Sequence, residues 1–99
     1  MNAPKITIDG KTYAAKRPTA GDIRALIERD AEDKGNMTVA EMLGWNIETL
    51  AKGYGLEESD VGRMDAADIV PAYQAYAKWA LGLVFSKLDK IPNAEGAAE

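Results

Sequence analysis

The last third of the chain carries the feature that most limits how this sequence can fold. Residues 69–90 predict one long helix, and on a helical wheel its apolar side chains span an arc of about 240°. The core-facing part of the arc holds Tyr73, Ala80 and Val84, and Phe85 lies toward one edge. A helix resting on a single layer needs an arc of only about 100°. The pattern therefore predicts either a central helix surrounded by the rest of the chain or a helix whose extra apolar surface faces another protein.

Large apolar side chains around this arc are the candidate binding residues if the second arrangement holds, because Trp and Tyr often anchor protein interfaces. Trp45 joins them, since it falls off the apolar stripe of its own predicted helix and suits either an interface or the edge of a hairpin. The candidate partner-binding residues are Tyr76, Trp79, Leu83, Phe85 and Trp45.

Residues 5–15 predict a β-hairpin. Asp9-Gly10 lies between two short β-prone runs, and this pair favours a type I′ turn because both central residues need positive φ. A two-residue turn sets Ile6 opposite Tyr13 and puts Ile8 on the same face. A lone hairpin is marginal in water. We expect this face to cover the helical core, with pairing of the free edge to another chain as the alternative.

Two further helices are expected. The first should begin after Thr19, because Thr19 and Asp22 can cap its N-terminus, and it should end at Gly35. It is a charged surface helix with a narrow apolar stripe. The stripe consists of Ile23, Leu26, Ile27 and Ala31.

The second of these helices has stronger boundaries. Thr38 and Glu41 form a capping box, Met37 and Met42 suit a hydrophobic staple, and Gly55 is a left-handed stop. Its apolar stripe is Val39, Leu43, Ile47, Leu50 and Tyr54. From both long helices together, the residues expected to be buried are Leu43, Ile47, Leu50, Tyr73, Ala80 and Val84.

Residues 57–68 concentrate negative charge. They hold five acidic residues against Arg63 alone, a net charge of −4, whereas the first 17 residues hold four basic residues against one acid, a net of +3. A chain polarised in this way could associate head to tail. The acids also suit helix starts: Asp68 as N-cap places Pro71 in the first turn, where its missing N–H breaks no helical hydrogen bond. A start at Asp65 would put Pro71 inside the helix and kink it.

The residue types that the sequence lacks exclude most kinds of catalytic and metal-binding site. Without Cys or His there are no disulfides, thiolate nucleophiles, zinc sites or Ser–His pairs. Val61 occupies a ligand position of the acidic stretch, which argues against a calcium loop. A net charge of −4 has the wrong sign for neutralising many phosphates. We therefore expect a binding protein that is not an enzyme, with no metal, no other cofactor and no nucleic-acid partner.

The expected fold class is mainly α (α+β), with a short N-terminal β-hairpin followed by about three helices, the last one long and broadly apolar. Residues 1–92 form a single domain, with the hairpin at 5–15 and the helical part at 20–90, and residues 93–99 form a flexible acidic tail. No apolar run approaches the ~20 residues of a membrane helix, and the N-terminus lacks a secretory signal. We expect a cytoplasmic protein that does not bind membranes.

The order of these segments resembles a known family. The hairpin KITIDGKTYAAKRPTAGD leads into a charged helix, the next helix ends in KGYGLEESDV, and the last helix finishes KWALGLVFSKLDKIPNAEG. Over residues 4–94 this is similar to the tail assembly chaperones of long-tailed bacteriophages and prophages. The resemblance implies a non-enzymatic protein of the bacterial host cytoplasm that binds the helical tape measure protein, helps recruit tail tube subunits and self-associates as a homo-oligomer.

A different class of function also fits the composition. A small acidic regulatory or inhibitory protein of phage type could place its carboxylates in a basic cleft of a host protein. Such binding would weaken steeply with salt, whereas binding through an apolar groove would not.

Overall fold

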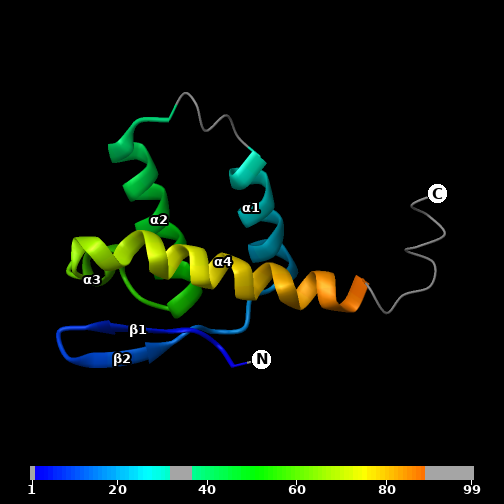
Figure 1. The fold of residues 1–99 in the computed structure, drawn as a ribbon, viewed down its shortest axis with the longest axis horizontal. Helices are drawn as coiled ribbons and strands as arrows, with labels where there is room; N and C mark the ends of the chain where they lie inside the picture. The colour runs from blue at the N-terminus through cyan, green and yellow to red at the C-terminus, as the bar shows by residue number, and fades with distance from the viewer. Residues whose placement is uncertain (1, 32–36, 89–99) are drawn as a thin grey trace.

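The computed structural model describes residues 2–31 and 37–88 and is mainly helical, with an N-terminal antiparallel hairpin (Figure 1). The expected fold class is therefore confirmed. The elements are β1 (Lys5–Ile8), β2 (Lys11–Ala14), α1 (Ala20–Ala31), α2 (Val39–Tyr54), the single turn α3 (Glu58–Val61) and α4 (Ala66–Leu88). The predicted helix end at Gly35 and the predicted tail 93–99 lie outside the described residues.

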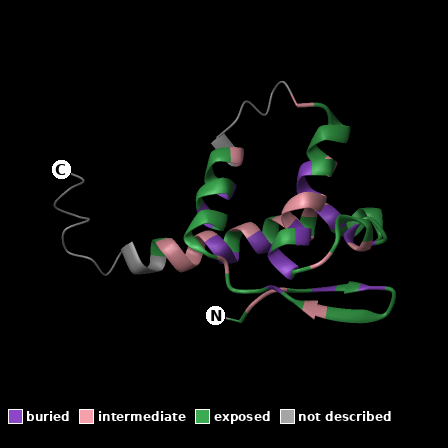
Figure 2. Cartoon of the chain, turned by 180° about the vertical axis from the view of Figure 1, so that it is seen from behind, coloured by how far each residue is buried: buried purple, intermediate pink, exposed green. Residues whose placement is uncertain are grey.

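Helix α4 runs through the middle of the molecule. Helices α1 and α2 stand against one side of it, the hairpin runs along the other, and α3 lies near its N-terminal end (Figure 1). Buried residues gather where α2, α4 and the hairpin meet, whereas the far parts of α1 and α2 are largely exposed (Figure 2). Tyr76, Trp79 and Ala80 of α4 are buried in this core. The central-helix arrangement therefore holds for the middle of α4, and it accounts for much of the wide apolar arc.

The hairpin has the predicted turn and register. Asp9 and Gly10 have φ angles of 51° and 82°, and Ile6 pairs with Tyr13. Ile6 and Ile8 are buried against the helices. Where the chain leaves β2, the N–H of Lys16 donates to the carbonyl of Gly53 at 2.8 Å and so ties the hairpin to the end of α2. The expectation that the hairpin covers the helical core is confirmed.

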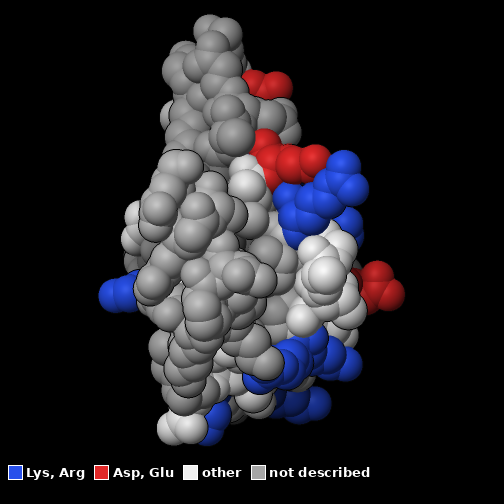
Figure 3. Space-filling model, turned by 90° about the vertical axis from the view of Figure 1, so that its right-hand side faces the viewer, with Lys and Arg blue, Asp and Glu red and all other residues white. Residues whose placement is uncertain are grey.

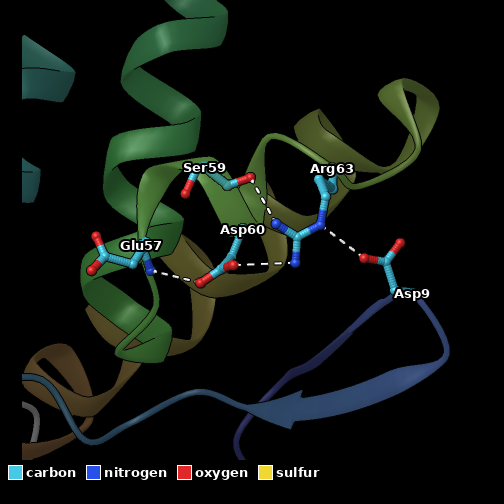
Figure 4. A network of polar contacts seen from close by, with 5 residues as sticks. All are labelled: Asp9, Glu57, Ser59, Asp60 and Arg63. Carbon is cyan, nitrogen blue, oxygen red and sulfur yellow. Dashed lines mark hydrogen bonds and ion pairs between the residues drawn. The ribbon is translucent and has the colours of Figure 1, made fainter.

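A polar network joins the hairpin tip to α3 (Figure 4). The Nε of Arg63 donates to Asp9 Oδ2 at 2.8 Å, and its Nη2 lies 3.1 Å from Asp60 Oδ1. Asp60 Oδ2 also accepts from the backbone N–H of Glu57 at 3.3 Å. The hydrogen bond to Asp9, followed by that to Asp60, raises the pKa of Arg63. Because these groups are largely exposed to water, the network orients the tip more than it stabilises the fold.

Local capping signals set several helix ends. Asp22 N–H donates to Thr19 Oγ1 at 3.2 Å, and Thr19 N–H donates to Asp22 Oδ2 at 3.0 Å. At the end of α2, Gly55 adopts the left-handed conformation with φ 69°, and Leu56 N–H donates to the carbonyl of Ala51 at 2.8 Å. This is a Schellman motif. The predicted start of α1 and end of α2 are confirmed.

The predicted start of the last helix is wrong. Helix α4 begins at Ala66, one turn before Pro71, because Asp65 rather than Asp68 acts at its N-terminus: Asp65 Oδ1 accepts from Ala67 N–H at 2.9 Å. Pro71 therefore lies inside a helix of 23 residues. It has no N–H for the Ala67 carbonyl, but Ala67 is exposed and water can replace the missing bond.

The predicted core face of α2 is partly wrong. Leu50 and Tyr54 are buried as expected, but Val39, at the other end of the stripe, is 70% exposed. Helix α2 stands upright on α4 instead of lying along it (Figure 1), so its far end rises away from the core. The residues expected to be buried that are only partly so are Leu43, Ile47, Tyr73 and Val84.

Candidate protein-binding surface

An open apolar groove lies between the first turns of α2 and the first half of α4. Its cavity volume is about 230 Å³. Most of its accessible lining is apolar, and no carboxylate, lysine or arginine contributes to it. We call it the α2–α4 groove. It is lined by Met37, Thr38, Val39, Met42, Trp45, Asn46, Val70, Tyr73 and Gln74.

The α2 side of the groove presents apolar side chains to solvent. Val39 is 70% exposed and Met42 is 38% exposed. The capping box holds this end of the helix in place: Glu41 N–H donates to Thr38 Oγ1 at 3.1 Å, and Thr38 N–H donates to Glu41 Oε1 at 2.9 Å. The hydrogen bond that the Thr38 backbone N–H donates to the Glu41 carboxylate, followed by one from the Thr38 side chain, lowers the pKa of Glu41. The exposed Val39 and Met42 therefore lie on a helix end that the capping box holds in place.

Trp45 forms part of the floor of the groove. Its ring meets that of Tyr73 edge to face, with 5.7 Å between centroids. The guanidinium of Arg29 lies over the indole at 5.6 Å, and Arg29 Nη2 also pairs with Glu48 Oε1 at 2.6 Å. Cation–π and edge-to-face contacts of this kind hold a ring in one orientation. The floor is therefore preformed.

Asn46 is a buried polar residue of the groove lining, with 3% of its surface exposed. The indole Nε1 of Trp45, which also lines the groove, is buried and has no hydrogen-bond partner within the described parts of the chain. Most buried polar groups in proteins are hydrogen-bonded, and a buried donor without a partner costs free energy. The indole N–H of Trp45 is therefore the polar group of the lining that is left without a partner.

The groove suits an apolar side chain carried by another polypeptide. Met37 and Met42 are flexible and polarizable, so they adapt to different apolar shapes. An amphipathic helix commonly binds by laying its apolar face into such a groove.

The five predicted binding residues do not form one surface. Tyr76 and Trp79 are buried in the core, so the expectation that they face a partner is wrong: the hairpin, α1 and α2 enclose this part of α4. Trp45 is also buried, but it lines the floor of the groove. Leu83 is half-buried and Phe85 is 50% exposed, because the end of α4 extends past α1 (Figure 1).

Sequence reasoning missed most of the groove. Val39 was assigned to the core stripe, Met37 and Met42 to a helix staple, and Asn46 to no role at all. One sequence signal did point toward this region. Trp45 lies off the apolar stripe of its helix, and such a large side chain needs contacts that the stripe cannot supply.

A smaller, charged crevice separates α1 from α2. Its cavity volume is about 180 Å³, with Tyr76 and Leu26 at its base and Lys52 and the Arg29–Glu48 pair among its walls. Burial raises the pKa of Tyr76. Throughout residues 2–31 and 37–88, no group of three or more carboxylates could hold a metal ion, and no helix has the length and hydropathy needed to cross a membrane.

Comparison of the chain with protein-family models, with curated proteins and with solved structures finds no match.

Proposed function

We propose that this is a non-enzymatic binding protein that holds an apolar helical segment of a longer protein in the α2–α4 groove. The observation that carries the proposal is the groove itself: Val39 is 70% exposed and Met42 is 38% exposed, beside a floor that contains the buried Trp45 ring. Exposed apolar surface with a defined hollow is typical of a protein–protein site.

The resemblance to tail assembly chaperones gives this partner a specific form. In that role the bound segment belongs to the tape measure protein, and tail tube subunits later replace the chaperone in the cytoplasm of the bacterial host. Such a partner is long and helical, so it can present the same kind of apolar face repeatedly to many copies of a small binder.

The size of the groove agrees with reversible binding. A volume of about 230 Å³ accommodates one or two side chains, and burying each contributes roughly 1.5–3 kcal/mol. Association itself costs several kcal/mol, which leaves each contact weak. Stable coating of a long helix therefore comes from many copies acting together, and each copy can be displaced.

The acidic segment is less suited to the alternative role of an inhibitor that mimics a polyanion. Its side chains already serve the fold: Asp60 accepts from Glu57 N–H and pairs with Arg63, and Asp65 caps α4. These contacts leave fewer free carboxylates for a basic cleft.

Isothermal titration calorimetry with helical peptides tiled along the tape measure protein encoded with this chain tests the proposal. We expect at least one peptide to bind, and Met42→Lys to weaken its binding by about tenfold or more, because the new charge must be desolvated in the groove. The matched control is Ile27→Ser, an apolar position of α1 that is 44% exposed and outside the groove. It should bind like the wild type. The proposal fails if no peptide binds, or if both variants bind equally well.

A further inference from the structure

The ring of Trp45 belongs to two cavities at once. It lines the α2–α4 groove, and it also lines the charged crevice between α1 and α2. Tyr73 contacts the ring from the groove, whereas Arg29 contacts it from the crevice. A change in the crevice that moves this ring therefore changes the floor of the groove.

The orientation of the indole depends on packing. Its Nε1 is buried and has no hydrogen-bond partner among the residues that the structure describes, so no hydrogen bond fixes the ring. The packing includes the edge-to-face contact with Tyr73, at 5.7 Å between centroids, and the guanidinium of Arg29, at 5.6 Å from the indole centroid. Tyr73 belongs to α4, which forms one wall of the groove, and Arg29 lies in the last turn of α1. Arg29 therefore reaches Trp45 from a helix that takes no part in the groove.

Glu48 holds Arg29 in this position. Arg29 Nη2 lies 2.6 Å from Glu48 Oε1. Glu48 follows Trp45 by three residues on α2, which puts the two side chains on the same face of that helix. One guanidinium therefore meets both a carboxylate and an indole of α2, and it ties the last turn of α1 to them. We call this arrangement of Arg29, Glu48 and Trp45 the Arg29 clamp.

A second ion pair of α1 does not reach either cavity. At the level of α1, one side of the molecule carries acidic and basic side chains next to each other (Figure 3). Arg24 Nε lies 3.1 Å from Glu28 Oε2, but these side chains are 80% and 63% exposed, against 39% and 37% for Arg29 and Glu48. Arg24 lines neither the crevice nor the groove. Of these two pairs, only Arg29–Glu48 is connected to the groove.

We infer that Arg29 is a positioning residue for the α2–α4 groove, and that the Arg29 clamp makes binding in this groove modestly sensitive to salt. The groove lining holds no charged side chain, so direct contacts with an apolar helix face depend little on ionic strength. Salt screens the partly exposed Arg29–Glu48 pair, which loosens the Trp45 ring and lowers the affinity of the groove. Arg29 thereby regulates the site of the proposed function, on which this inference rests.

Two substitutions in α1 test the inference by calorimetry with a helical peptide from the proposed tape measure partner. Arg29→Met removes the charge and keeps an unbranched apolar side chain. Arg24→Met is the matched control, because it loses the same charge and also an ion pair. Binding to Arg29→Met should be about three- to tenfold weaker, since one cation–π contact and one ion pair are lost. Arg24→Met should bind like the wild type, and Arg29→Lys, which keeps the charge, should recover part of the affinity.

A salt series separates the clamp from charges on the peptide. Arg29→Met and Arg24→Met have the same net charge, so long-range attraction or repulsion of a charged peptide changes in both to a similar extent. Raising the sodium chloride concentration should weaken peptide binding to the wild type and to Arg24→Met, and should affect Arg29→Met less. The inference is overturned if the three proteins show the same salt dependence, or if Arg29→Met binds the peptide as tightly as the wild type.

NMR without peptide shows whether Arg29 acts through the ring. Nuclear Overhauser effects between the Trp45 and Tyr73 rings should weaken in Arg29→Met and persist in Arg24→Met. Those between Tyr76 and Trp79, whose centroids lie 6.1 Å apart in the core, should persist in both. Unchanged Trp45–Tyr73 effects in Arg29→Met would overturn the inference even if peptide binding is weaker. If no peptide binds to the wild type, the proposed function fails, and these effects alone decide whether Arg29 sets the ring.

Discussion

Substitution of Gly53 by alanine tests how α2 and α4 pack. Gly53 lies in the last turn of α2, where alanine ordinarily favours a helix by roughly 0.5–1 kcal/mol. In this structure a Cβ at that position would lie 2.6 Å from Cε1 and Cζ of Tyr76. The ring cannot easily turn away, because its centroid lies 6.0 Å from that of Tyr54 and 6.1 Å from that of Trp79.

The two effects oppose each other, and the clash should win. Overpacking a filled core costs about 1–3 kcal/mol, so the net loss for Gly53→Ala is about 1 kcal/mol. Gly44 is the matched control in the same helix, since nothing lies within 4 Å of a Cβ placed there. Gly44→Ala should therefore gain roughly 0.5–1 kcal/mol.

Thermal unfolding followed by far-ultraviolet circular dichroism measures the difference. A gap of nearly 2 kcal/mol separates the two melting temperatures by about 10 °C in a domain of this size. Replacing Tyr76 by leucine should remove most of the penalty of Gly53→Ala, because the two positions are coupled through contact. If Gly53→Ala melts as high as Gly44→Ala, the close approach of the two helices is not as described.

Three further outcomes follow from burial and backbone geometry. Leu50→Ala, at a fully buried site, should cost about 2–5 kcal/mol in urea unfolding, and Ile47→Ala, which is half-buried, only about half as much. Gly55→Ala should cost about 1–2 kcal/mol, because φ is 69° there and the Lys16 side chain fills the space, whereas Gly44→Ala carries no such cost. Burial raises the pKa of Tyr54 from 10.0 to about 12, so the free energy of unfolding should fall as pH rises through this range. Tyr54→Phe should weaken that fall. An unchanged pH profile in Tyr54→Phe would contradict the raised pKa of Tyr54.

Features set by neighbouring residues were predictable from the sequence. The Asp9-Gly10 turn fixes the hairpin register, and the side chain of Thr19 and the left-handed Gly55 mark helix ends through local hydrogen bonds. Each depends on a few adjacent residues and not on the rest of the fold. The start of α4 was missed because Asp65 and Asp68 are both plausible caps, and the sequence cannot rank them.

Features set by the angle between helices were not predictable. A regular apolar stripe predicts a helix that lies along its neighbour, but α2 stands upright on α4, so Val39 is exposed and Trp45 is buried. The same angle opens the groove and places Asn46 inside it. For α4, the arc correctly indicated more apolar surface than one layer can cover, but it did not separate the enclosed Trp79 from the exposed Phe85.

The most direct test of the groove is a methyl NMR titration of methionine-labelled protein with a helical peptide from the proposed tape measure partner. Met37 and Met42 line the groove, whereas Met64 is buried elsewhere in the core and serves as an internal reference. We predict that the methyl resonances of Met37 and Met42 shift as peptide is added, while that of Met64 stays in place. Saturating peptide that leaves both groove methionines unchanged would contradict binding in the α2–α4 groove.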